Sequence, residues 1–391
     1  MTGAQSGTGT GTRSESPSRS RPRQRSPRLP KPRGPLSAAV TALLRESPQA
    51  GVSVPVPVPS PDDCHPYGDD LQLALYLLYE LHYQGFQDVP DHLEWDSRLL
   101  ACRGAIENRF LGALREDVPM AGADTAQQAL NALQIEPAGD DGTSVSHFLH
   151  DEGDLGHLRE YAALRSLYHL KEADPHAWVI PRLHGRAKAA MVAVEFDEFG
   201  AGRADEIHAE LFADLMADLD LDTAYGHYVD AAPAEALATV NLMSLLGLHR
   251  ALRGALVGHF ATVEVTSPPA SRRLAEAMRR TGAGPAAVRF YTEHVEADAV
   301  HEQVVRHDVV GGLLESEPGL EADVTFGIRA TTHLENRLSA GLLRAWRSGA
   351  TALRGPGLAL RRDGTARTGP GTPTQHPPAP HTPVKEPGGS P

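Results

Sequence analysis

The sequence predicts an all-α protein, and three observations carry that prediction. Between about residues 69 and 348, apolar side chains recur nearly throughout at the three- and four-residue spacing of amphipathic helices. The same region has no convincing period-two strand pattern and no internal repeat. Proline and glycine fall where one helical pattern stops and the next starts. We therefore expect one helical bundle of about 280 residues, large enough to keep a closed site away from water.

The individual helices follow from the same patterns. Residues 71–86 are apolar on almost every side and end at Gly85, as expected for a central buried helix. Residues 97–116 have an amphipathic spacing, with one apolar face. Further helices are predicted at about 124–134, 144–170, 175–198, 204–219, 221–229, 233–263, 268–281, 284–315 and 319–348.

Both ends of the chain differ from this body in composition. Residues 1–35 hold eight Arg or Lys and one Glu, a net charge of +7. Because the whole chain has a net charge of -13, the remaining residues carry -20. We predict a disordered basic arm over 1–68, with one short helix at 37–46 and an extended proline-rich spacer at 52–61. Residues 351–391, rich in Pro and Gly, are predicted to be a disordered tail. The domain between them spans 69–350.

Composition excludes several classes of protein. Cys64 and Cys102 are the two cysteines among 391 residues, too few for a disulfide framework or a thiolate metal site, so any metal must be held by His and carboxylate. The N-terminus shows no secretory signal, and the longest apolar run, 73–79, is far too short to span a bilayer. We expect a cytoplasmic protein without membrane contact. The basic arm lacks interleaved aromatics and the body is acidic, which argues against sequence-specific nucleic-acid binding.

The densest group of ligand-type residues lies within 289–308. At about 100° per residue, Asp298 falls about 40° from His294, and His301 about 20° on the other side, so the three share one narrow helix face. Two imidazoles and one carboxylate suit iron or manganese. The alternative is a polar helix face with chance histidines, since the chain holds 19 of them.

A second group lies in VEFDEFGAGRADEIHAELFADL, which contains Glu195, Glu198, Glu206, His208 and Glu210. An unbroken helix would separate Glu198 and His208 by about 80°, but the glycines at 200 and 202 break it and can aim both side chains at one point. The alternative is an ordinary helix corner with a solvated acidic face.

Other polar residues are weaker candidates. Glu172 stands at a predicted helix end beside Asp174, and the residues alone give no reason to select one over the other. Five more polar groups lie in apolar helices, where satisfied core or supporting roles are the preferred interpretation: Glu80, His82, His249, His259 and Glu264.

Three segments together resemble a known family. EFGAGRADEIHAELF, FYTEHVEADAVHE and, before them, LYHLKEADPHAWVIPRLHG are similar to the haem-oxygenase-like diiron oxidases and oxygenases, a group of iron-containing redox enzymes. The resemblance covers about residues 70–350 and neither tail. It implies a seven-helix haem-oxygenase-like bundle without haem. It also implies six metal ligands: Glu172, Glu198, His208, His294, Asp298 and His301.

The resemblance further implies the chemistry. A set of three carboxylates and three histidines would hold two Fe(II)/Fe(III) ions that use O2 to oxidise a small organic molecule, by N-oxygenation of an amine or amino-acid-like substrate or by oxidative C–C cleavage. An external electron donor and a homodimer are compatible with this class. The alternatives are a mononuclear iron protein and a helical scaffold or binding protein that has lost catalysis.

Overall fold

The computed structural model describes residues 26–46, 58–118, 125–134 and 142–355, and within them the chain is helical with no β-strand. The predicted all-α class is therefore confirmed. No helix in these residues combines the length and apolar character needed to cross a membrane.

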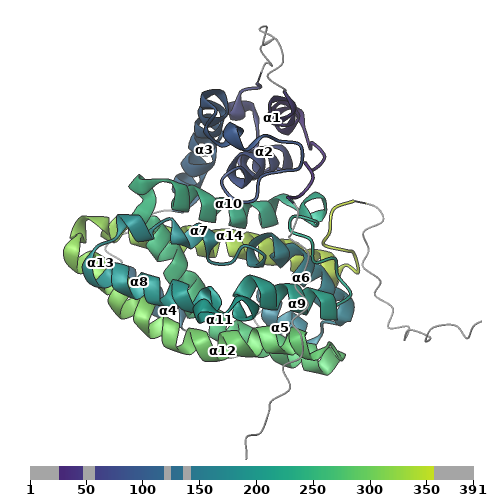
Figure 1. Ribbon diagram of the computed structural model, residues 1–391. Helices are drawn as coiled ribbons and strands as arrows, with labels where there is room; N and C mark the ends of the chain where they lie inside the picture. Colours follow the sequence, from purple (N-terminus) through teal and green to yellow (C-terminus); the bar gives the residue numbers. More distant parts are fainter. Residues whose placement is uncertain (1–25, 47–57, 119–124, 135–141, 356–391) are drawn as a thin grey trace, which may run out of the picture.

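The N-terminal helices form a layer against one side of the bundle (Figure 1). This layer contains α1 (Pro35–Arg45), α2 (Asp69–Glu80) and α3 (Ser97–Asp117), with α2 lying between the other two and packing on α10 (Ala234–Leu248). Ten of the twelve residues of α2 are buried, because neighbours surround it on all sides, as its uniformly apolar sequence predicts.

The position of α1 corrects the predicted domain boundary at residue 69. Leu36, Val40 and Leu44 are fully buried in the main core, so this part of the arm belongs to the folded domain. The Asp70 carboxylate on α2 accepts hydrogen bonds from the backbone amides of Leu36 (2.9 Å) and Ser37 (2.7 Å) at the start of α1. Residues 1–25 and 47–57 of the predicted arm, and 356–391 of the predicted tail, lie outside the described residues.

The remaining helices build the bundle that holds the ligand-type residues (Figure 1). In chain order they are α4 (Ala126–Leu133), α5 (Val145–Asp151), α6 (Leu155–His169), α7 (Asp174–Ala177), α8 (Gly185–Glu198), α9 (His208–Asp218), α10, α11 (Arg253–Thr281), α12 (Pro285–Val304), a π-helical turn (Val305–Val310), α13 (Gly311–Ser316) and α14 (Glu321–Arg347).

The long helix α11 lies between α12 and α14 and packs on both. Its contact with α14 is close because each helix presents a glycine. A Cβ added at Gly258 would lie 2.0 Å from the Val324 carbonyl oxygen, and one at Gly327 would lie 1.9 Å from that of Ala255. A side chain at either position would force the helices apart.

Several predicted helix boundaries were wrong. Residues 221–229 are not helical, the single helix expected over 175–198 is divided into α7 and α8, and α11 continues through residue 281 although it was expected to stop near 263. The last difference concerns Pro268 and Pro269, which lie inside α11. Packing against α12 and α14 outweighs the cost of two prolines in a helix interior.

Candidate metal centre

Glu172 lies in the short connection between α6 and α7. The next residue, Ala173, has φ 74°, in the left-handed region that L-residues adopt at a cost of about 1–2 kcal/mol. This backbone reversal gives Glu172 and Asp174 different surroundings. Glu172 is buried beside two histidines, whereas Asp174 is absent from both clusters of metal-ligand atoms found among the described residues. The geometry therefore separates two residues that the sequence could not.

The glycine break after α8 brings Glu198 and His208 together. Glu198 is the last residue of α8 and His208 the first of α9. Three consecutive residues between them, 200–202, all have positive φ, and a Cβ on Gly200 would lie 2.7 Å from the Ile207 backbone nitrogen. The turn places the His208 Nδ1 atom 2.7 Å from the Glu198 Oε2 atom.

The helix α12 supplies two histidines from one face. His294 and His301 are both buried, at 6% and 3% exposure, in agreement with their predicted alignment. Asp298 lies between them on the helix, and its side chain is outside the described part of the chain.

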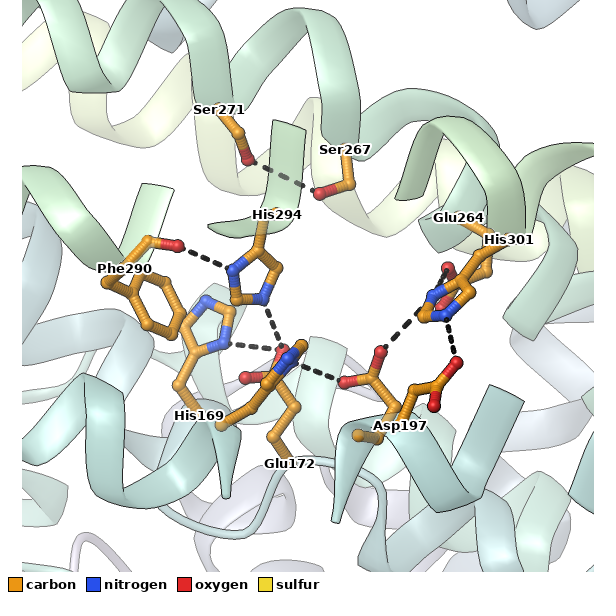
Figure 2. Close-up of polar contacts among 11 residues, drawn as sticks. His169, Glu172, Asp197, Glu264, Ser267, Ser271, Phe290, His294 and His301 are labelled. Carbon is orange, nitrogen blue, oxygen red and sulfur yellow. Dashed lines mark hydrogen bonds and ion pairs between the residues drawn. The ribbon is translucent and has the colours of Figure 1, made fainter. Parts of the chain in front are cut away.

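The first cluster contains Glu172, His208 and His294, whose ligand atoms all lie within 4.8 Å of one another (Figure 2). The His294 Nδ1 atom lies 2.7 Å from the Phe290 carbonyl oxygen, which can only accept a hydrogen bond, so Nδ1 carries the proton. The His294 Nε2 atom then presents its lone pair toward the Glu172 Oε1 atom, 3.7 Å away. That tautomer is the one a metal ligand requires.

The second cluster contains Glu198, Glu264 and His301, also within 4.8 Å of one another. The His301 Nδ1 atom lies 3.5 Å from the Glu198 Oε1 atom and 3.4 Å from the Glu264 Oε2 atom. Glu264 comes from α11, and its inclusion departs from the sequence prediction, which gave it only a supporting role. Its sole sequence signal is a carboxylate in an apolar helix.

Glu198 connects the two clusters. Its Oε2 atom faces His208 of the first cluster and its Oε1 atom faces His301 of the second, so one carboxylate lies between both groups. A carboxylate in this position can bridge two metal ions.

Neighbouring charges outweigh burial at two of the candidate ligands. Burial by itself would raise the pKa of Glu172, but the nearby His169 charge and a 2.9 Å hydrogen bond from the His169 Nδ1 atom hold that pKa well below its ordinary value. Burial by itself would lower the pKa of His208, but the Glu198 carboxylate beside it raises that pKa above its ordinary value. These side chains therefore favour their charged forms in spite of burial.

Glu195, one turn before Glu198, behaves differently. Burial, followed by the charges of Glu198 and Glu264, raises its pKa to about 9, so the carboxyl group holds its proton at neutral pH. Neither of its oxygens has a hydrogen-bond partner among the described residues.

The donor set fits metal cations. Glu172, Glu198 and Glu264 are each buried, and three carboxylates so close together repel one another unless positive charge lies between them. The Glu172 Oε2 atom is buried and has no hydrogen-bond partner in the described part of the chain. Mixed imidazole and carboxylate ligands suit iron.

A cavity of about 350 Å³ adjoins the centre. Its wall includes Glu172, Glu198, Glu264 and His294, so a molecule inside it would lie beside both clusters. The same wall carries Arg165 and Glu335, joined by two parallel hydrogen bonds of 2.9 and 2.7 Å. This volume is at the lower end of the range typical of small-molecule sites.

The other candidates have structural partners. Glu80 pairs with Lys171, His82 with Glu94, His249 with Glu107 and Glu206 with Arg289, while His259 contacts the Thr331 hydroxyl. Each of these polar groups therefore has at least one polar contact outside the two clusters, whereas Glu264 lies within one of them.

Comparisons with known proteins find similarities in the part of the chain that carries these clusters. A family model described as iron-containing redox enzyme matches residues 159–336, a segment that holds every residue of both clusters. A curated relative, nitrosourea synthase from Streptomyces achromogenes subsp. streptozoticus, is 26% identical over 235 residues. That match covers 58% of this chain and 49% of the relative, so the chain spans about half of the relative's length.

The bundle and its two His/Glu clusters form a candidate metal centre within the matched segment. Over residues 159–336 the chain is similar to the iron-containing redox enzymes.

Proposed function

We propose that this protein is a non-haem diiron oxygenase that uses O2 to oxidise a small organic molecule. The observation that carries the proposal is the pair of buried three-residue clusters joined through Glu198. A mononuclear site would need only one of them.

In this proposal each cluster holds one iron. Glu172, His208 and His294 bind the first ion, and Glu198, Glu264 and His301 bind the second. Asp298 of α12 is a further ligand that the family resemblance implies. Four carboxylates would offset the four positive charges of two Fe(II) ions, which favours their burial. Two iron ions held side by side would supply the electrons that activate O2, without haem.

The chain itself contributes orientation, a proton and a shielded volume. The Phe290 carbonyl holds the His294 ring, and the Glu195 carboxyl group keeps a proton one helical turn from Glu198. The cavity beside Glu172 and Glu264 would hold the organic substrate next to the metal ions.

We propose N-oxygenation of an amine or amino-acid-like molecule as the reaction, with oxidative C–C cleavage as the second candidate. The relative's name, nitrosourea synthase, supports chemistry at nitrogen. The cavity wall supports a polar substrate, because Arg165 and Glu335 offer both signs of charge. Turnover would draw electrons from an external donor. A homodimer and a cytoplasmic location remain expectations.

The first test is an anaerobic Fe(II) titration of the full chain, followed by rapid mixing with O2 while the visible spectrum is recorded. We expect two irons per chain and a transient absorption band. One iron with no transient would favour a mononuclear protein, and absence of iron binding would favour a scaffold.

The second test identifies the reaction. The iron-loaded protein is incubated with a reductant, 18O2 and a panel of amines and amino acids, and the products are analysed by mass spectrometry. We expect an N–O product that carries 18O. Oxygen consumption that never yields an N–O bond across the panel would contradict N-oxygenation.

A further inference from the structure

The His301 ring has the second cluster on its Nδ1 side. Its other side borders a second pocket, which is smaller than the cavity beside the metal centre. Its Nδ1 atom faces Glu198 and Glu264, whereas its Nε2 atom lies 3.3 Å from the Asp197 Oδ2 atom (Figure 2). The pocket, about 270 Å³, is lined by Asp197, His208 and His301 among others. His301 therefore presents one nitrogen to buried carboxylates and the other to an acidic side chain at a pocket.

The two histidines of α12 are used in opposite orientations. His294 donates a hydrogen bond from Nδ1 to the carbonyl of Phe290, four residues earlier on its own helix, and presents Nε2 to the first cluster. His301 presents Nδ1 to the second cluster. For His301 the hydrogen-bond partner of Nε2 therefore decides the tautomer.

Asp197 supplies what that orientation needs. A carboxylate accepts hydrogen bonds, so the contact with Asp197 keeps a proton on Nε2. The ring can then bind a metal ion only through the lone pair of Nδ1, the atom that faces Glu198 and Glu264. Carboxylates that orient a metal-binding histidine in this way contribute about 10- to 100-fold to metal affinity.

The location of Asp197 argues against a packing role. Its side chain is 55% exposed, in contrast to its neighbour Glu198 at 7%. Both belong to the last turn of α8, so a single turn delivers a ligand to the metal centre and a hydrogen-bond acceptor to the far side of His301.

We propose that Asp197 is a positioning residue that fixes the tautomer of His301 and so strengthens iron binding at the second cluster. This inference rests on the proposed function, in which His301 is an iron ligand. Asp197 itself belongs to neither ligand cluster.

The experiment compares Asp197→Ala with the full wild-type chain in anaerobic Fe(II) titrations against a competing chelator. We expect one of the two irons to bind about 10- to 100-fold more weakly and the other to be unchanged. Asp197→Glu, which keeps the acceptor, should recover part of the affinity. The matched control is Asp205→Ala, which replaces an exposed aspartate in the connection between α8 and α9. This variant should bind both irons as the wild type does.

A second readout reports the tautomer directly. The metal-free protein is labelled with 15N-histidine, and the His301 resonances are assigned by their loss in His301→Gln. These resonances should show the Nε2–H tautomer, and Asp197→Ala should lower its population. Unchanged iron affinities and an unchanged tautomer in Asp197→Ala would overturn the inference. A wild-type chain that binds fewer than two irons would instead contradict the proposed function, so the two failures are distinguishable.

Discussion

At the scale of single residues, the centre depends on which nitrogen of each histidine faces the ligand cluster. His294 and His301 lie two turns apart on one helix, yet a backbone carbonyl fixes one and an exposed carboxylate contacts the other. The identity of a ligand residue therefore does not specify the atom that it offers. That information comes from the neighbouring hydrogen-bond partners.

Glu264 provides the first residue-scale prediction. Glu264→Ala should weaken one of two bound irons by at least tenfold, because it removes a carboxylate from the second cluster and leaves the first intact. Anaerobic Fe(II) titration measures the effect. Glu276→Ala, an exposed position on the same helix, is the control. Equal iron affinities in the two variants would show that Glu264 is not a ligand.

His259 provides a prediction of pH dependence. Burial lowers its pKa from 6.5 to about 4. The Thr331 hydroxyl donates to the Gly327 carbonyl, so His259 Nδ1–H must donate to Thr331, and the ring is neutral in the folded protein. The unfolded chain binds a proton near pH 6.5, so this contribution to stability is complete above pH 6.5 and is lost as the pH falls toward 4, by roughly 3 kcal/mol in total.

Urea unfolding of the metal-free protein between pH 7 and 4.5 measures this effect. His259→Asn, whose amide can still donate to Thr331, should lose less stability than wild type over that range. His227→Asn, at a side chain that is 43% exposed, should retain the wild-type slope. Parallel slopes in all three proteins would contradict the assignment of His259 as a buried neutral group.

At the scale of elements, the connection that carries Glu172 is tied to the N-terminal layer. The Lys171 Nζ atom lies 2.9 Å from the Glu80 Oε2 atom of α2, and both side chains are almost completely buried. Tyr225 donates a 2.7 Å hydrogen bond to the other Glu80 oxygen, and the Tyr83 ring lies 4.1 Å from Lys171 Nζ. The ion pair thus joins α2 to the residue before a proposed ligand.

Breaking this pair from one side should be costly. Lys171→Met leaves the Glu80 carboxylate buried and uncompensated, and we expect the free energy of unfolding to fall by about 3–5 kcal/mol. Adding Glu80→Gln removes the charge but keeps an acceptor for Tyr225, so the double variant should be more stable than Lys171→Met alone. Urea denaturation of the wild type, Lys171→Met, Glu80→Gln and the double variant tests this, and strictly additive losses would contradict it.

The elements also show why the sequence predicted only part of the centre. His294 and His301 lie on one helix, so their shared face follows from the helical repeat alone. Glu264 joins them only because α11 packs along α12, a tertiary contact with no local signal. The choice between Glu172 and Asp174 depends on one left-handed residue, Ala173, and alanine has no intrinsic preference for that conformation.

At the scale of the whole molecule, the folded domain begins earlier than composition indicates. The basic charge of residues 1–35 suggests an arm, but the apolar repeat that follows in α1 lies in the main core. Composition averaged over a segment hides a short amphipathic helix, whereas the overall helical class is robust because it rests on many repeats.

Truncation tests this boundary. Removing residues 1–46 deletes α1 and three fully buried aliphatic side chains, each contributing about 1.5–3 kcal/mol, so the thermal midpoint should fall by several degrees or the protein should fail to fold. Removing residues 1–25 leaves α1 in place and should preserve the midpoint and iron-dependent O2 consumption. Identical midpoints for the two truncations would show that α1 adds nothing to the domain.

The two prolines in α11 have a consequence for how the centre opens. Pro268 has no amide proton to donate to the carbonyl of residue 264, so α11 lacks one helical hydrogen bond there. After α12, the α-helical hydrogen-bond pattern changes to a π-helical turn that begins four residues after His301. Each of these helices therefore has a weak point beside its last proposed ligand. Local opening at these two points needs no unfolding of the bundle. The backbone amides on either side of Pro268 and Pro269, and those of residues 305–310, should therefore exchange with deuterium faster than the rest of the core, and bound iron should slow that exchange.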